Sequence, residues 1–323
     1  MRFLGVDSDQ DRRRIQALRA DPPGHARRGK RKEVFGAALE QWDELLAASA
    51  AVAPDAAPIL LFYALSQGGR AACAARIAGQ PWASTGHGLT VGQPTGGIEN
   101  TTVRPEGGAN TSFAMFCRAA GSESLTAPTT LGTLWAANPK LEPAPDLGQG
   151  SPRALELSPI TSGGPTSRAL IIGPVAEGLP ADESAAAAEL AKRLAPYPGA
   201  ADGLIVSNAF PRTGANGRHQ VEIGWRDTNG QPIDVAAVAS GYGPPNSGTI
   251  LRPALNSSRD VLRLLPLWWA TLLVLSSIAR YHPAEWSAAL ARDRSRAAIP
   301  IEDGLDIARE MLPWLLLGLL QSP

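Results

Sequence analysis

The sequence predicts an α+β protein: a helical bundle built from N- and C-terminal helix pairs, with a β-containing middle insertion. Long apolar runs with helical spacing lie near both ends of the chain, and short runs separated by Gly, Pro, Asn and Ser fill the middle. Neither end has enough polar surface for its two helices to stand alone. The simplest arrangement therefore joins the two helix pairs and packs the middle on one side.

Changes in composition set the expected boundaries. Residues 1–32 read as a flexible basic N-terminal segment, residues 33–89 and 259–323 as a joint helical bundle, and residues 90–258 as an α+β insertion. The first segment ends in the basic run ARRGKRK. In a chain whose 30 basic and 30 acidic residues balance, a short basic run is more typical of a solvated segment than of a phosphate-binding one.

The N-terminal helix pair is expected at residues 33–53 and 58–77. The first helix is amphipathic, whereas the second, PILLFYALSQGGRAACAARI, is apolar nearly all round and should be buried. Its Gly68-Gly69 pair costs about 1 kcal/mol per glycine relative to Ala in a helix interior. Such a pair is useful where another backbone packs closely against the helix.

The C-terminal pair begins in the stretch 264–290, in which residues 264–279 are nearly all apolar. The pattern is broken at Tyr281-His282-Pro283 and restarts at Glu285. A membrane span needs roughly 20 apolar residues, and this run is shorter and ends in Arg280, so we expect a core helix. A last helix is predicted at residues 301–320.

The middle of the chain is expected to contain short strands and one short helix at 184–194. The candidate strands are 154–157, 169–172, 204–207, 220–225, 233–238 and 249–251. Asp227-Thr228-Asn229-Gly230 is typical of a hairpin turn between two of them. The glycine-rich stretch 241–248 lacks the Lys-Ser/Thr ending of a P-loop and reads as a loop.

Several classes of site find no support in the sequence. The N-terminus has no apolar signal-peptide core, two cysteines are too few for a disulfide framework, and the four histidines show no metal-ligand spacing. We therefore expect a cytoplasmic protein of bacterial type that binds no metal, no cofactor and no membrane.

The two buried helices share the pattern Leu-Ser-x-x-x-Arg, which places Ser66 with Arg70, and Ser276 with Arg280, on one face of each helix. A lone charge on an apolar helix is expensive to bury. One interpretation pairs both arginines with carboxylates of neighbouring helices. The candidate partners are Asp43, Glu44, Glu285, Asp303, Asp306 and Glu310. The other makes Arg70, Arg280, Ser66 and Ser276 an anion-binding site, because guanidinium forks suit phosphate.

Arg280-Tyr281-His282-Pro283 is similar to the Arg and His pair of helical RNases of the HEPN class. In that class the two residues are about five to seven positions apart, whereas here they are two apart and point to different sides of a helix. As a structural alternative, His282 ends the helix before Pro283. His87, between two glycines, is the other candidate histidine.

Two segments resemble the YaaC-like protein family of bacteria. The resemblance is carried by the LFYALSQ-G-R core and GHGL within residues 60–89, and by LRPALN and LSS-ARYHP-W within residues 251–289. It implies a cytoplasmic bacterial protein and brings no established catalytic mechanism. It also implies a place in a multi-protein system such as defence against phage.

Our first expectation for function is a non-catalytic helical scaffold or interaction subunit that holds a protein partner or nucleic acid, with the middle domain supplying contacts. The alternative is an HEPN-like RNase or a phosphate- or nucleotide-binding protein that uses Arg70, Arg280, His87 and His282. A small-molecule sensor that binds an anion between the helix pairs lies between these two.

Overall fold

The computed structural model describes residues 7–160, 168–213, 217–241 and 249–322. The chain forms two compact units, one of residues 1–151 and 255–323 and the other of residues 152–254. The expected insertion, 90–258, is thus wider than the second unit, because residues 90–151 pack with the helices of the first. The glycine-rich stretch at 242–248 lies outside the described residues.

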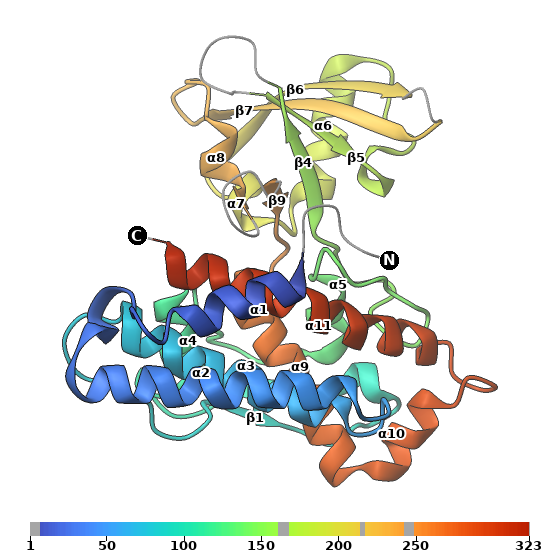
Figure 1. Ribbon diagram of the computed structural model, residues 1–323. Coiled ribbons are helices and arrows are strands. Elements are labelled where there is room, and N and C mark those ends of the chain that lie inside the picture. The colour runs from blue at the N-terminus through green and yellow to red at the C-terminus, as the bar shows by residue number, and fades with distance from the viewer. Residues whose placement is uncertain (1–6, 161–167, 214–216, 242–248, 323) are drawn as a thin grey trace. The chain divides into compact units, whose positions relative to one another are not determined.

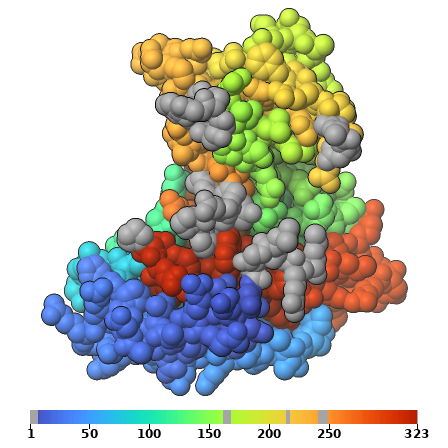
Figure 2. All heavy atoms as spheres, turned by 45° about the horizontal axis from the view of Figure 1, so that its top comes forward, coloured from blue at the N-terminus to red at the C-terminus, as the bar shows by residue number. Residues whose placement is uncertain are grey.

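The first unit is a helical bundle made from both ends of the chain, as the sequence predicts. Its helices are α1 (Ser8–Ala17), α2 (Gly29–Ala50), α3 (Ala57–Arg76), α4 (Ser112–Ala119), α5 (Leu131–Ala136), α9 (Leu264–Tyr281), α10 (Pro283–Leu290) and α11 (Ala298–Gln321), with 3-10 turns η1 (Gly24–Arg27) and η2 (Ile98–Asn100). Helix α3 packs against α2, α9 and α11, and α1 packs against α11. Figure 2 shows the blue N-terminal residues directly beside the red C-terminal ones.

Helix α9 is the buried centre of this bundle. All residues from Leu264 to Ser276 are buried, and the Trp269 ring meets the rings of Phe62 and Phe113 at centroid distances of 5.1 and 5.2 Å. In length and composition α9 also meets the criteria for a membrane span, but 83% of that window is buried inside the protein, as in a core helix. The helix ends at Tyr281, and Pro283 starts α10, so the break predicted from the sequence is confirmed.

The glycine pair of α3 lies where side chains of other helices come closest to its backbone. A Cβ atom on Gly68 would lie 2.9 Å from Leu316 Cδ2 of α11 and 3.3 Å from Trp42 Cδ1 of α2. A Cβ on Gly69 would lie 3.3 Å from the Phe116 ring of α4. The close approach expected at these glycines is therefore made by side chains.

Residues 8–32 are ordered by contacts with the bundle, in contrast to the flexible segment that the sequence predicts. Arg12 of α1 pairs with Asp43 of α2 at 2.8 Å. Arg31, in the basic run, donates to the carbonyls of Ala74 and Ile77 at 3.0 and 2.7 Å. These carbonyls end α3 and would otherwise lack partners, so the basic run closes a helix terminus.

A small antiparallel sheet completes the first unit. Its strands are β1 (Leu89–Val91), β2 (Thr102–Pro105) and β3 (Thr129–Thr130), in the order β1-β2-β3. Strand β1 and helix α5 both contact α9. This packing explains why residues 90–151 belong with the helices.

The second unit is a six-stranded antiparallel sheet with short helices. Its elements are β4 (Leu155–Pro159), β5 (Arg168–Ile172), η3 (Pro174–Ala176), α6 (Glu183–Leu194), α7 (Pro198–Ala201), β6 (Leu204–Thr213), β7 (His219–Asp227), α8 (Val235–Val238), β8 (Ser240–Gly241) and β9 (Thr249–Leu251). The strand order is β6-β7-β5-β4-β9-β8. Helix α6 packs on β6, and its Leu190 and Leu194 join a core with Ile171, Ile223 and Trp225 of the sheet.

One predicted strand of this unit is wrong. Residues 235–238 form the helix α8, because the Asp234 side chain accepts a hydrogen bond from the backbone N–H of Ala236 and caps the helix. The predicted turn at Asp227 is present, and its carboxylate accepts from the N–H groups of Asn229 and Gln231. After this turn the chain pairs with β7 through the bridge between Arg226 and Pro232 and through the hydrogen bond from the Ile233 N–H to the Trp225 carbonyl.

Candidate functional site

Arg280 reaches from α9 to α3, at the contact between the two apolar helices. Its Nη1 donates to the Tyr63 hydroxyl at 3.1 Å, and its Nε donates to the carbonyl of Ser276 at 3.1 Å. The guanidinium carbon also lies 4.9 Å from the centroid of the Tyr281 ring. Among the described residues Arg280 has no carboxylate partner, so the expected ion pair is absent and a tyrosine takes its place.

The hydroxyls of Ser66 and Ser276 lie buried on the same two helices. Neither Oγ atom has a hydrogen-bond partner among the described residues. Buried polar atoms are nearly always hydrogen-bonded, and an unpaired hydroxyl costs stability. Ser276 is fully buried and Ser66 is partly buried, whereas Arg70 is exposed. An anion-binding site shared by these two serines and both arginines stays a prediction.

Arg70 is exposed and lines a pocket of about 210 Å³ with Val34, Cys73, Trp82 and Ser84. Within the described part of the chain Arg70 makes no ion pair and no hydrogen bond. Among the described residues, none of the candidate carboxylates pairs with Arg70. Asp43, for example, pairs with Arg12. Of the arginines predicted from the sequence, Arg70 is the one with free donors beside a cavity.

Two further guanidinium groups lie around the buried Trp82. The guanidinium carbon of Arg31 lies 4.9 Å from the centroid of the Trp82 ring, and Arg118 Nη2 donates to the carbonyl of Pro81 at 3.0 Å. Because the hydrogen bonds of Arg31 and Arg118 go to neutral carbonyls, their charges are not cancelled. No carboxylate is among the described residues that line this pocket. We call Arg31, Arg70, Trp82, Ser84 and Arg118 the Trp82 site.

The cysteine of this pocket is not a nucleophile. Burial raises the pKa of the Cys73 thiol to about 12, against a smaller opposing effect of the Arg118 charge. A thiol with that pKa is protonated at neutral pH, and the thiolate is the reactive form. The Cys73 thiol therefore offers no nucleophile at the Trp82 site.

The two candidate histidines have different surroundings. His87 is exposed in the loop before β1, with its ring centroid 6.2 Å from that of Phe62. His282 lies at the junction of α9 and α10. Its backbone N–H donates to the carbonyl of Ile278, and its carbonyl accepts from the backbone N–H of Trp286. His282 thus has the helix-ending position that the sequence predicts as the structural alternative.

The last residue of the LRPALN segment, Asn256, donates a hydrogen bond to the buried carboxylate of Asp260. Asp260 accepts hydrogen bonds from the Thr126 N–H at 2.5 Å, the Thr126 hydroxyl at 2.7 Å, Asn256 Nδ2 at 2.7 Å and the Ala127 N–H at 3.3 Å. Burial raises the pKa of a carboxyl group, but these hydrogen bonds outweigh it and hold the pKa of Asp260 below its ordinary value. Asn256 and Asp260 therefore hold the chain where it re-enters the first unit.

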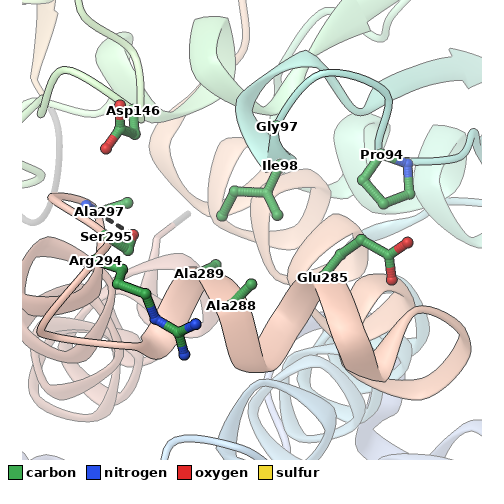
Figure 3. A pocket seen from close by; sticks show the side chains of 10 residues that line it. All are labelled: Pro94, Gly97, Ile98, Asp146, Glu285, Ala288, Ala289, Arg294, Ser295 and Ala297. Carbon is green, nitrogen blue, oxygen red and sulfur yellow. Dashed lines mark hydrogen bonds between the residues drawn. The ribbon is translucent and has the colours of Figure 1, made fainter.

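A second hollow, of about 300 Å³, lies between α10 and the segments at residues 94–98, 146 and 294–297 (Figure 3). Its wall is apolar and includes Ile98, Ala288 and Ala289. Charged side chains lie at its ends: Glu285 on the first turn of α10, and Arg294 after that helix. Only the break at His282-Pro283, which turns the chain into a separate short helix, signals this hollow in the sequence.

Comparison with known proteins gives one match. The model of the family described as YaaC-like Protein matches residues 12–320, which is nearly the whole chain. No curated protein and no solved structure is significantly similar. The match extends the resemblance seen at two segments to the second unit and to α1.

Proposed function

We propose, from the premise that the chain belongs to the YaaC-like family, that it is a non-catalytic binding protein whose helical unit recognises a phosphate-bearing small molecule at the Trp82 site. The observation that carries the proposal is Arg70, a guanidinium without a partner among the described residues, which lines a pocket with Trp82. Two more guanidinium groups lie close to this tryptophan, with Arg31 over its ring and Arg118 bound to the carbonyl of Pro81. A guanidinium fork binds phosphate oxygens in a bidentate manner.

The pocket is suited to the phosphate end of a ligand. Its volume, about 210 Å³, is below the roughly 300–1,000 Å³ of pockets that enclose a whole drug-sized molecule. A phosphate group would meet Arg70 and the Ser84 hydroxyl, while the rest of the molecule stays outside. Ser84 Oγ already lies 2.9 Å from Ser112 Oγ, and a hydroxyl can donate and accept at once.

The RNase alternative has less support from the geometry. Arg280 is committed to Tyr63 and to the Ser276 carbonyl, and Ser276 itself is buried. Of the four residues in this alternative, Arg280 is thus used in holding α3 to α9. This is the reason for proposing binding without catalysis.

The test is calorimetric titration of the full chain with inorganic pyrophosphate. Arg70→Gln removes the free guanidinium, and Arg13→Gln removes the same charge from an exposed position of α1. A charge-assisted hydrogen bond contributes about 1.5–3 kcal/mol, so Arg70→Gln should weaken binding by at least about tenfold. Arg13→Gln should leave it unchanged, and higher salt should weaken it in the wild type. Equal affinity in wild type and Arg70→Gln, or no binding in the wild type, would sink the proposal.

An interaction subunit is the second candidate function, and a feature of the second unit favours it. Strand β6 lies at an edge of the sheet and exposes Ile205 and Phe210 by 55% and 38%. An edge strand with exposed apolar side chains is suited to pairing with a strand of a protein partner. A partner that co-purifies from the native cells should be lost with Ile205→Lys and retained with Val52→Lys, which changes an exposed apolar residue of the other unit. Loss in both variants, or in neither, would argue against β6 as the contact.

A further inference from the structure

The hollow beside α10 has an apolar wall that is part of the protein's own core. Ile98, Ala289 and Ala297 border it, although they are only 6%, 8% and 1% exposed. Pro94 and Ala288 extend the same surface outward. A hollow of about 300 Å³ with such a wall is at the small end of the range for ligand pockets.

The polar groups at one side of the hollow are already satisfied. Asp146 accepts from the Arg296 N–H at 3.2 Å and pairs with the Arg296 guanidinium at 3.6 Å. The Ser295 hydroxyl accepts from the Ala297 N–H at 3.2 Å, the dashed line in Figure 3. Asp146 and Ser295 thus hold the loop after α10 through their contacts with Arg296 and Ala297.

Two charged side chains of opposite sign retain the capacity to bind a ligand. Glu285 makes no hydrogen bond and no ion pair within the described part of the chain. Arg294 lies 3.4 Å from Asp293, but both side chains are more than three-quarters exposed, and such a surface pair contributes little. Figure 3 shows Glu285 and Arg294 at opposite ends of the hollow, with Ala288 and Ala289 between them.

We infer that this hollow binds a short apolar peptide with both termini free, of the size of a di- or tripeptide. Its ammonium group meets the Glu285 carboxylate, its carboxylate meets the Arg294 guanidinium, and its side chains lie against Ile98 and the alanines. A free amino acid does not fit this arrangement, because its ammonium and carboxylate are bonded to one carbon. A peptide separates the two by about 3.3–3.6 Å for each residue added.

The test titrates leucyl-leucine and trileucine into the wild-type chain, with N-acetylated and C-amidated forms of each. Glu285→Gln should weaken binding of the free peptide by roughly fivefold, the size of a partly screened ion pair of about 1 kcal/mol. The same variant should bind the N-acetyl peptide as the wild type does, because the ammonium is already gone. Arg294→Gln should behave in the same way towards the amidated peptide.

Glu44→Gln is the matched control, since Glu44 is an exposed carboxylate of α2. It should change no affinity. The inference is overturned if the wild type binds neither free peptide, or if Glu285→Gln weakens free and acetylated peptides equally. Because Arg70 has no part in this site, Arg70→Gln should leave peptide binding intact, so failure here and failure of pyrophosphate binding are separate results.

Discussion

Replacement of Asp260 by Asn tests how the chain is held where it re-enters the helical unit. The wild-type carboxylate accepts four hydrogen bonds, two at Oδ2 from backbone N–H groups, one at Oδ2 from Asn256 and one at Oδ1 from the Thr126 hydroxyl. Asn keeps one acceptor oxygen but loses the negative charge, and its NH2 group faces the Thr126 hydroxyl that donates to Oδ1 in the wild type. With about 1.5–3 kcal/mol for each hydrogen bond to a charged group, and some of the four retained, we expect a loss of roughly 3 kcal/mol.

The loss should depend on pH in a defined direction. A carboxyl group whose pKa is lower in the folded state stabilises the protein fully above its unfolded-state pKa of about 4. That contribution is lost as the pH falls through the lowered folded-state pKa. The stability difference between wild type and Asp260→Asn should therefore be largest near neutral pH and shrink below about pH 4.

Tryptophan fluorescence during urea unfolding is the appropriate assay, because seven of the eight tryptophans belong to the first unit. Asp21→Asn, at an exposed position, is the control and should change stability little. A loss below about 1 kcal/mol at pH 7, or a difference that grows as the pH falls, would refute the role assigned to Asp260.

Three further predictions concern the contacts of α3 and the thiols, and all use the full chain. Gly68→Ala should destabilise the protein by about 1 kcal/mol, because overpacking exceeds the gain in helix propensity. Gly36→Ala should stabilise it, because a Cβ there meets no neighbour. Urea unfolding measures whether each variant gains or loses stability. Tyr63→Phe should lower the free energy of unfolding by about 1 kcal/mol, because it removes the hydrogen bond from Arg280. In an Arg280→Met background the same substitution should lower it by much less. An equal loss in both backgrounds would contradict the hydrogen bond. Burial raises the pKa of both cysteine thiols to about 12, so iodoacetamide at pH 8 should label neither in the native protein and both after denaturation, as mass spectrometry would record.

The long helices could be predicted from the sequence because their apolar runs are uninterrupted and end at clear signals. Pro58 opens α3, and His282-Pro283 separates α9 from α10. Burial of α9 on all sides follows from its composition alone. The joint packing of both chain ends follows as well, because neither helix pair could cover its own apolar surface.

The remaining features depend on contacts between residues far apart in the chain. The basic run at 26–32 is typical of a solvated segment when the sequence is considered alone. In the structure, Arg31 donates to carbonyls at the end of α3 that lie 43 and 46 residues away along the chain. The alternating pattern at 233–238 favours a strand until Asp234 caps a helix. Local signals of this kind are overridden by tertiary context.

The candidate site was predicted in part. The Leu-Ser-x-x-x-Arg pattern draws attention to Arg70 and Arg280, and because it occurs on two helices it suggests one shared site. Arg280 meets Tyr63, whereas Arg70 lines a pocket with Trp82, and the cations near Trp82 and Pro81, Arg31 and Arg118, come from different helices. No spacing in the sequence relates these three arginines, so only the fold brings them together.

The most direct measurement of the central claim is a crystal structure of the protein soaked with tungstate, a phosphate analogue located by its anomalous scattering. The account predicts an anion within hydrogen-bond distance of the Arg70 guanidinium, about 2.7–3.2 Å, beside Trp82 and Ser84. Tungstate bound elsewhere, with none at Arg70, would contradict it.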